Sequence, residues 1–279
     1  MKTSYFIIMA AFGFLQACAS GSGDTDGFVP SGGDSGAGDT GAQSDVIPGE
    51  IVLSPRDKAN NLVLDEGALF YSTQYDPAII AWDIAAETEE NVAWDYRDLE
   101  AFTVVDGRIW GGFSDSGIEG WVSEILPPKS ETEWAYQATD GTLFRHPVDV
   151  AFHKNHLYVA DLKANQVWKV SETGGAESAA VAEDVLCLAV AGGEVFYGGE
   201  SGVFALSGAQ VDERPVLAMG LRGENLYGIH PKSGFFEIGT NKQWDLSGPP
   251  RPGSFVWYDN GLYSVDEVGG AIWRFNIPE

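Results

Sequence analysis

The chain has 279 residues, with 41 acidic and only 16 basic side chains, which gives a formal net charge of −25 at pH 7. A surface this negative repels other polyanions, so the composition excludes nucleic acid as a partner and argues against direct contact with anionic lipid headgroups.

The chain opens with a segment typical of an export signal. Met1 and Lys2 form a charged start, and the apolar run from Tyr5 to Leu15 is too short to span a bilayer. This run ends in Leu15-Gln16-Ala17-Cys18, which resembles the lipobox of bacterial lipoproteins. The resemblance implies that residues 1–17 are removed and that Cys18 becomes a lipidated amino terminus. An ordinary secretory signal that happens to contain a cysteine is the alternative.

The residues that follow Cys18 bear on the destination of the protein. They are Ala19 and Ser20, whereas bacterial lipoproteins retained in the inner membrane carry an acidic residue there. The resemblance therefore implies a lipid-anchored protein of the bacterial cell envelope, at the outer rather than the inner membrane. Acyl chains on Cys18 would provide the contact with the membrane, because each buried CH₂ contributes about 0.8 kcal/mol.

Residues 18–48 are expected to form a flexible tether. They are almost wholly Gly, Ser, Asp, Thr and Ala, and such a segment buries too little apolar surface to offset its ordering entropy. Its Asp-Gly pieces resemble fragments of calcium loops, but the fixed ligand spacing and the closing Glu are missing. We therefore predict a solvated linker.

Six copies of one hydrophobic pattern occupy the chain between Asn61 and Asp266. In each copy an aliphatic residue precedes a reference aromatic residue, and large apolar residues stand six and eight positions before it. This alternation, followed by a turn-forming pair, is typical of a β-hairpin, and repeats of about 31 to 48 residues with this content indicate propeller blades. The reference residues are Phe70, Trp110, Tyr158, Phe196, Tyr227 and Tyr263.

Further strands complete each copy except the last. A third strand carries Trp or Phe at one equivalent position, which favours packing between blades, and a fourth, outer strand follows most copies, although residues 209–212 are short and polar. The sixth copy ends after three strands. We therefore predict an all-β fold, a six-bladed β-propeller of four-stranded blades over residues 49–279, with its last blade closed by an N-terminal strand at about residues 50–53.

The third copy carries the clearest family resemblance. Its segments Pro147-Val148-Asp149-Val150-Ala151-Phe152 and Leu157-Tyr158-Val159-Ala160-Asp161 resemble blades of the superfamily that contains NHL repeats and gluconolactonase-type enzymes. In those lactonases a Glu, an Asn and an Asp hold a divalent metal at the channel mouth, and the Asn follows the Pro of this motif. Val148 stands at that position here, and no Glu matches, which argues against a complete lactonase site.

Four polar residues are candidate ligands at the channel. Asp161, His230 and Asp266 each stand three positions after a reference aromatic residue, which places them at one rim, and Asp149 lies on an innermost strand. Carboxylates and imidazole bind Ca²⁺ or other divalent cations, but an Asp that ends a strand also commonly binds backbone NH groups of the next turn. Cys187 aligns with Asp149, and we expect a core or channel-lining thiol there.

Two functions of different classes agree with this pattern. The first is a noncatalytic binding or scaffold module, monomeric and tethered to the membrane through Cys18, that recognises a protein, peptide or glycan, without a catalytic residue or required cofactor. The second is a metal-dependent hydrolase of the lactonase kind with altered channel ligands. Bound metal, measured on the purified protein, separates the two.

Overall fold

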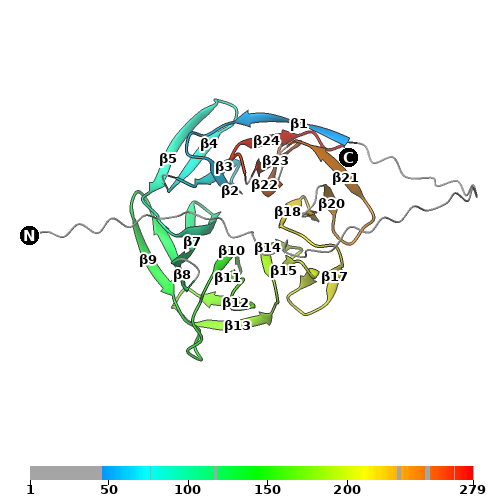
Figure 1. Cartoon of the computed structure of the whole chain (residues 1–279). Coiled ribbons are helices and arrows are strands. Elements are labelled where there is room, and N and C mark those ends of the chain that lie inside the picture. The colour runs from blue at the N-terminus through cyan, green and yellow to red at the C-terminus, as the bar shows by residue number, and fades with distance from the viewer. Residues whose placement is uncertain are drawn as a thin grey trace, which may run out of the picture. The chain divides into compact units, whose positions relative to one another are not determined.

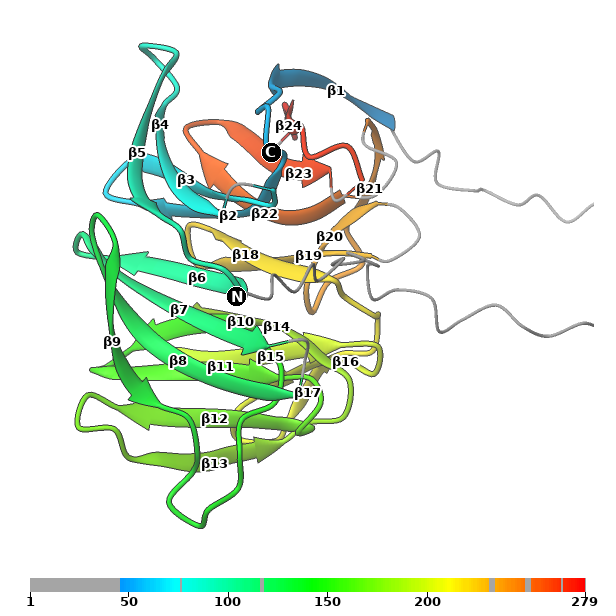
Figure 2. The same ribbon diagram turned by 60° about the vertical axis from the view of Figure 1, so that its left-hand side comes forward.

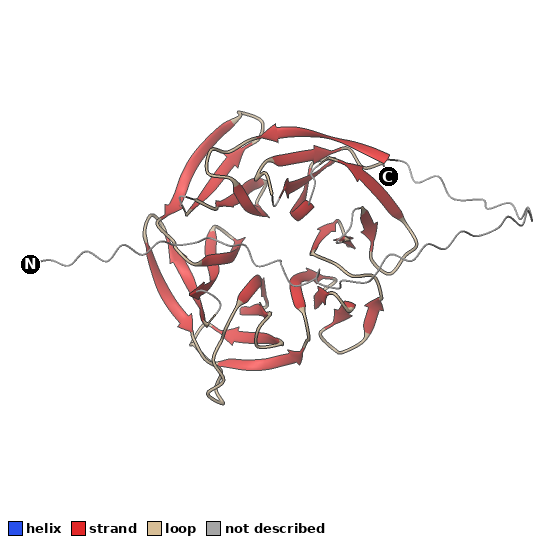
Figure 3. Ribbon diagram, viewed as in Figure 1, coloured by secondary structure: helices blue, strands red, loops and turns tan. Residues whose placement is uncertain are grey.

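The computed structural model describes residues 46–75, 77–115, 118–230, 234–248, 252–266 and 268–278. The export signal, Cys18 and the tether up to residue 45 lie outside these ranges, and the chain from Gln43 onward forms one compact unit. The described residues fold as strands and turns, as Figure 3 shows. None of them belongs to a helix with the length and hydropathy needed to cross a membrane.

Period-two alternation of apolar and polar residues sets the strands, and the turns between them use residues that tolerate positive φ, such as Gly67 at +83° and Asp106 at +53°. In the described residues the strands are β1 (Val46–Leu53), β2 (Ala59–Asp65), β3 (Ala68–Thr73), β4 (Ala78–Asp83), β5 (Thr88–Trp94), β6 (Leu99–Val105), β7 (Arg108–Asp115), β8 (Glu119–Leu126), β9 (Ser130–Ala135), β10 (Pro147–His153), β11 (His156–Asp161), β12 (Gln166–Ser171), β13 (Ala176–Val181), β14 (Val185–Ala191), β15 (Glu194–Gly199), β16 (Gly202–Ala205), β17 (Gln210–Asp212), β18 (Ala218–Arg222), β19 (Asn225–Ile229), β20 (Phe235–Glu237), β21 (Gln243–Ser247), β22 (Pro252–Tyr258), β23 (Gly261–Asp266) and β24 (Ile272–Phe275).

The strands form a β-propeller, so the predicted all-β propeller class is confirmed. Four sheets have four strands each, β2–β5, β6–β9, β10–β13 and β14–β17, and each strand pairs with the next one in sequence. The first strand of each sheet lies nearest the centre of the ring, and the later strands follow outwards (Figure 1). These four first strands and β18 and β22, the two end strands of the remaining sheet, contact one another in the order β2, β6, β10, β14, β18, β22 and back to β2.

The remaining strands form a single eight-stranded sheet, in the order β18-β19-β20-β21-β1-β24-β23-β22, in place of two separate blades. The reason is β1, which bonds on both sides. Val46 to Pro48 pair in parallel with β21, whereas Gly49 to Leu53 pair antiparallel with β24. In Figure 2, β1 runs along the outer edge of the ring beside these two strands.

The strand expected at residues 50–53 is therefore present and pairs with the end of the chain, but it begins earlier than predicted. Val46, Ile47 and Pro48, which we expected in the tether, belong to β1. Ile47 explains this difference, because its side chain is only 6% exposed and packs with Tyr227 and Phe275. Burying such a side chain contributes roughly 1.5–3 kcal/mol, which favours ordering the segment.

The core lies between neighbouring sheets. Trp110 of β7 stacks on Phe152 of β10 with ring centroids 4.4 Å apart, and Trp82 of β4 meets Tyr263 of β23 edge to face at 6.2 Å. Trp82, Trp168 and Phe236, which stand at the equivalent third-strand position, are all buried. Packing between blades, predicted for these aromatic residues, is thus confirmed for the three.

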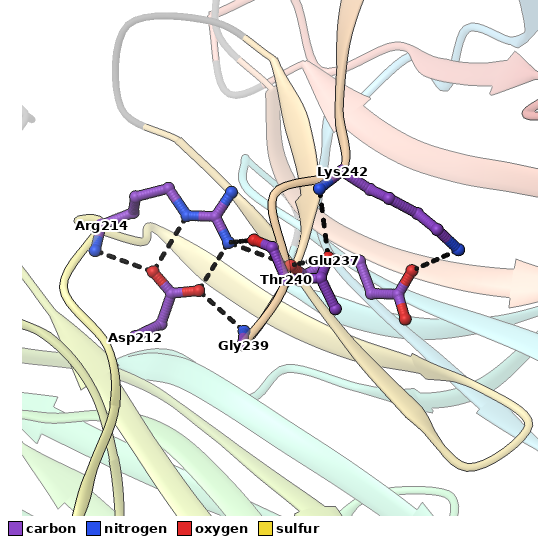
Figure 4. A network of polar contacts seen from close by, with 6 residues as sticks. All are labelled: Asp212, Arg214, Glu237, Gly239, Thr240 and Lys242. Atoms are coloured by element: carbon purple, nitrogen blue, oxygen red, sulfur yellow. Dashed lines mark hydrogen bonds and ion pairs between the residues drawn. The ribbon is translucent and has the colours of Figure 1, made fainter.

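The short outer strand of the fourth sheet, β17, is tied to the neighbouring sheet by a polar clamp. Arg214 binds both carboxylate oxygens of Asp212 and donates to the backbone oxygens of Glu237 and Thr240, at 2.9 and 2.8 Å (Figure 4). The guanidinium carbon also lies 3.9 Å from the centre of the Phe236 ring. These contacts compensate for a strand of only three residues.

Candidate functional site

Asp161, predicted as a rim ligand, ends β11 and is fully buried. One carboxylate oxygen accepts a hydrogen bond from the backbone N–H of Arg145 at 2.8 Å, and the other accepts from His146 and Ala164 at 2.9 and 3.0 Å. The carboxylate therefore holds the linker before β10 against the turn after β11. This is the structural role that the sequence offered as the alternative to cation binding.

Asp266 occupies the equivalent place at the end of β23 and is also buried. Its Oδ1 accepts from the N–H of Val268 at 3.1 Å, while its backbone bonds Gly270 and Ala271. His230 follows β19, and its N–H donates to the carbonyl of Gly234 at 3.1 Å. Both residues thus bond backbone groups that lie two to five positions further along the chain.

Asp149 on β10 connects two neighbouring inner strands. Its Oδ2 accepts from the N–H of Leu188 on β14 at 2.7 Å, and its Oδ1 accepts from its own neighbour Val150 at 2.8 Å. Burial raises the pKa of this carboxyl to about 7, although the two backbone hydrogen bonds act in the opposite direction. Asp149 therefore stabilises the junction between the third and fourth sheets.

Other polar residues at the same repeat position make the same kind of bridge. Asn61 Nδ2 donates to the carbonyl of Glu100 at 2.8 Å, and Ser254 Oγ bonds both the N–H and the carbonyl of Leu62 at 3.0 and 3.2 Å. Cys187, also at this position, is buried, and burial raises the pKa of its thiol well above the ordinary value. Of the two expected places, core or channel lining, its burial supports the core, and the raised pKa keeps the thiol protonated.

These residues do not fit the divalent metal that the lactonase resemblance implies. The oxygens of Asp149 and Asp161 already accept backbone hydrogen bonds, and Val148 offers no donor atom. Across the described ranges no three His, Cys, Asp or Glu side chains are grouped so that they could hold a metal ion. The predicted rim set therefore does not form one ligand cluster.

A different pair of polar side chains comes together beside Asp161. Glu100 lies near the start of β6, and His146 directly precedes β10; His146 Nε2 is 3.8 Å from Glu100 Oε1. The Glu100 side chain is 39% exposed and that of His146 is 15% exposed. The Nδ1 atom of His146 is buried without a hydrogen-bond partner in the described part of the chain. The pair thus combines a partly exposed carboxyl with an imidazole that has one buried nitrogen without a partner.

The electrostatic surroundings bring both groups towards their neutral forms. Burial, and then the negative charge of Asp98, raise the pKa of the Glu100 carboxyl to about 7. Burial, and then the positive charge of Lys163, lower the pKa of His146, against the opposing effect of Asp161. A carboxyl and an imidazole in these states can each donate or accept a proton or a hydrogen bond near neutral pH.

The repeat register contained a signal for Glu100 that the sequence analysis did not use. Val148 stands ten positions before Tyr158, and Glu100 stands ten positions before Trp110, so the two are equivalent in neighbouring copies. The first copy places Asn60 there, ten positions before Phe70. The His146 contact had no such signal, because it depends on how the linker before β10 lies against the second sheet.

Comparison with known proteins supports the fold. No family model and no curated protein matches the sequence. Several solved structures do match. A gluconolactonase from Xanthomonas campestris has 9% identity and a TM-score of 0.67, over 82% of this chain and 89% of that one. The PQQ-bound form of aldose sugar dehydrogenase from Streptomyces coelicolor has 10% identity and a TM-score of 0.59, over 81% of this chain and 96% of that one. A streptogramin B lyase matches with 12% identity and a TM-score of 0.56, over 82% and 99%. These similarities define a β-propeller, and at such identities they define the fold alone.

Proposed function

We propose that this protein is a membrane-anchored, extracytoplasmic propeller that binds a protein, peptide or glycan ligand at the channel mouth, beside Glu100 and His146, without transforming it. One observation carries the proposal: the carboxylates expected to act on a metal or substrate bond backbone N–H groups instead. We assign ligand binding to the Glu100 carboxyl, which is 39% exposed, and to the neighbouring His146 side chain, which is 15% exposed. A site of this kind supplies hydrogen bonds and shape rather than a complete catalytic set.

We further infer that the ring has six blades, the eight-stranded sheet counting as two. Each half of that sheet contains one copy of the repeat, with Tyr227 in β19 and Tyr263 in β23. β18 contacts β14 on one side and β22 on the other, and β22 contacts β2, as neighbouring blades do elsewhere in the ring. β1 would then serve both blades and remove an exposed sheet edge.

The anchor belongs to the same proposal. Cys18 would carry the lipid, and residues 19–45 would connect it to β1, which places the propeller outside the cytoplasm, at the outer membrane. Cys18→Ala is expected to release the chain from the membrane fraction and to remove its labelling by a radioactive fatty acid. Membrane retention of the variant with unchanged labelling would contradict lipidation at this residue.

Capture of partners from solubilised envelopes tests the binding role. The full chain is expected to retain a specific envelope protein or glycan, and Glu100→Gln together with His146→Phe is expected to reduce that retention at least tenfold. Glu124→Gln is a suitable control, because Glu124 is a carboxylate on another part of the second sheet that pairs with Arg108 at 2.9 Å. Equal retention by the channel-mouth variant and the wild type would refute binding at this site.

A lactonase-like hydrolase is the second candidate, and Glu100 is the observation that favours it, because it stands at the repeat position of the expected ligand and has a pKa of about 7. Hydrolysis of gluconolactone by the full chain, followed with added Ca²⁺ or Zn²⁺ and with EDTA, distinguishes the two. We expect the rate to equal that of the spontaneous reaction. Hydrolysis that depends on the metal and is lost in Glu100→Gln would favour the enzyme.

A further inference from the structure

A cleft lies on the outer part of the first sheet, and neither Glu100 nor His146 lines it. It has a volume of about 370 Å³, which is within the range of small-ligand sites. Ala78 and Ile80 of β4 are buried and form its floor. Its walls come from four separate places in the chain. They are Asp57 before β2, Thr73 at the end of β3, the group Asn91, Trp94 and Asp95 in and just after β5, and Lys129 from the turn between β8 and β9.

Trp94 is the aromatic residue in this wall, and it is 42% exposed. Its backbone N–H donates to the carbonyl of Pro128 at 3.1 Å, so the position of the residue is set by the neighbouring sheet. No ring contact involves Trp94 within the described ranges, whereas other tryptophans such as Trp110, Trp134 and Trp168 pack against aromatic neighbours. An indole that is not covered, on a backbone held by the neighbouring sheet, offers a flat apolar surface to a ligand.

Polar groups with unused bonding capacity surround the indole. In the part of the chain that the structure describes, the Asn91 amide makes no hydrogen bond, and the Asp57 carboxylate makes neither a hydrogen bond nor an ion pair. The Thr73 hydroxyl in the same cleft accepts a hydrogen bond from the N–H of Ala78 at 2.9 Å. An amide provides two donors and an acceptor, and a carboxylate provides acceptors alone. The cleft thus presents donors and acceptors beside an apolar face.

The charges in the cleft disfavour an anionic ligand. Lys129 pairs with Asp95, so these two side chains largely cancel each other, and Asp57 remains as the one further carboxylate in the wall. An anion would meet the unpaired charge of Asp57. The exposed indole and the amide of Asn91 favour a molecule with many hydroxyl groups and one apolar face over a simple cation, which would use Asp57 alone.

We propose that this cleft, which we call the Trp94 cleft, binds a neutral sugar ring. The weakly positive C–H groups of a pyranose would lie on the negative face of the Trp94 indole, and its hydroxyl groups would bond Asn91 and Asp57. The Trp94 cleft is separate from Glu100 and His146, so it does not depend on the function proposed for the channel mouth.

Saturation-transfer NMR and calorimetry with defined sugars test this proposal. The full chain is prepared in a detergent without a sugar headgroup and titrated with methyl β-glucoside, N-acetylglucosamine, cellotetraose and chitotetraose. We expect at least one of them to bind with one-to-one stoichiometry. Trp94→Ala and Asn91→Ala are each expected to weaken binding at least tenfold, and Trp94→Phe to retain most of it. Asn91 is exposed, so its variant tests the cleft without disturbing the core.

Two controls make the result specific. Tyr136→Ala removes an aromatic residue that is 51% exposed outside the Trp94 cleft, and Glu100→Gln alters the channel mouth; neither is expected to change sugar affinity. The proposal is overturned if none of the four sugars binds, if affinity survives Trp94→Ala, or if a diamine such as cadaverine binds more tightly than every sugar. Loss of sugar binding in Glu100→Gln would assign the sugar to the channel mouth instead.

Discussion

At the scale of single residues, one carboxylate can look like a ligand in the sequence and act as a cross-link in the structure. Asp149 accepts hydrogen bonds from Leu188 on the next inner strand and from Val150, and Asp161 accepts from three backbone N–H groups. A buried N–H without an acceptor costs about 1–3 kcal/mol, so removing either carboxylate is costly in itself. Loss of function in such a variant would therefore say little about metal binding.

Asp149 also makes stability depend on pH. Its pKa in the folded chain, about 7, lies above the ordinary value for an unfolded Asp, so the folded state binds the proton more tightly. The stabilisation from this group is complete below the unfolded pKa and is lost as pH rises through about 7. Asp149→Asn, which does not titrate, is expected to remove this part of the decline in unfolding free energy between about pH 4 and 7, measured by urea titration. An unchanged pH profile would contradict the assignment.

His146 allows a second test at this scale. The positive charge of Lys163 contributes to lowering the pKa of this imidazole, after burial. Lys163→Gln is therefore expected to raise the pKa of His146 towards its ordinary value, measured from the titration of the imidazole signals by NMR and assigned with His146→Asn. Lys169→Gln is the matched control, because Lys169 pairs with Glu177 at 3.2 Å on the third sheet. A shift of equal size in both variants would argue against the local charge effect.

At the scale of elements, β1 shows how one strand completes two edges. It bonds β21 with its first half and β24 with its second half, and the change from parallel to antiparallel pairing occurs between Pro48 and Gly49. The first half was not predicted, because residues 46–48 continue a composition that reads as tether. Only the position of β21 beside them provides a partner for their backbone.

Two isoleucines of β1 differ in burial and form a matched pair. Ile47 is 6% exposed and Ile51 is 55% exposed. Ile47→Asp places a charge in an apolar cluster and is expected to lower the unfolding free energy by roughly 2–4 kcal/mol, whereas Ile51→Asp is expected to stay within about 0.5 kcal/mol of the wild type. Denaturant titration of the full-length variants measures both. Equal effects would mean that the first half of β1 does not pack as described.

The clamp at β17 provides a second prediction about an element. The Asp212 side chain is 6% exposed, and Arg214→Ala would leave this carboxylate without its counter-charge, at a cost of about 3–5 kcal/mol. We expect faster proteolysis near residues 210–214 and a lower melting temperature. Arg97→Ala should have almost no effect. Arg97 is 80% exposed, and its ion pair with Asp95 is long, at 3.9 Å, so the pair contributes little to stability. A melting temperature that Arg214→Ala leaves unchanged would show that the clamp is dispensable.

At the scale of the whole molecule, the excess of 41 acidic over 16 basic side chains leaves a charge of −25 on a chain of 279 residues. Repulsion among these charges opposes a compact ring and is screened by salt. The melting temperature of the full chain is therefore expected to rise by a few degrees between about 20 and 300 mM NaCl. Potassium glutamate at equal ionic strength controls for effects specific to chloride, and a falling melting temperature would mean that attractive ion pairs dominate.

The sequence by itself determined the propeller, because burial of alternate residues in strands leaves a period that is visible along the chain, and six copies of it repeat the same constraint. The tertiary structure alone decided which polar residues are free to act. Whether Asp161 also binds the N–H groups of Arg145 and His146, and whether Glu100 meets His146, depends on contacts between residues 15 or more positions apart. Such contacts leave no period in the sequence, because each is made once, by linkers and strand ends that lie together only when the ring closes.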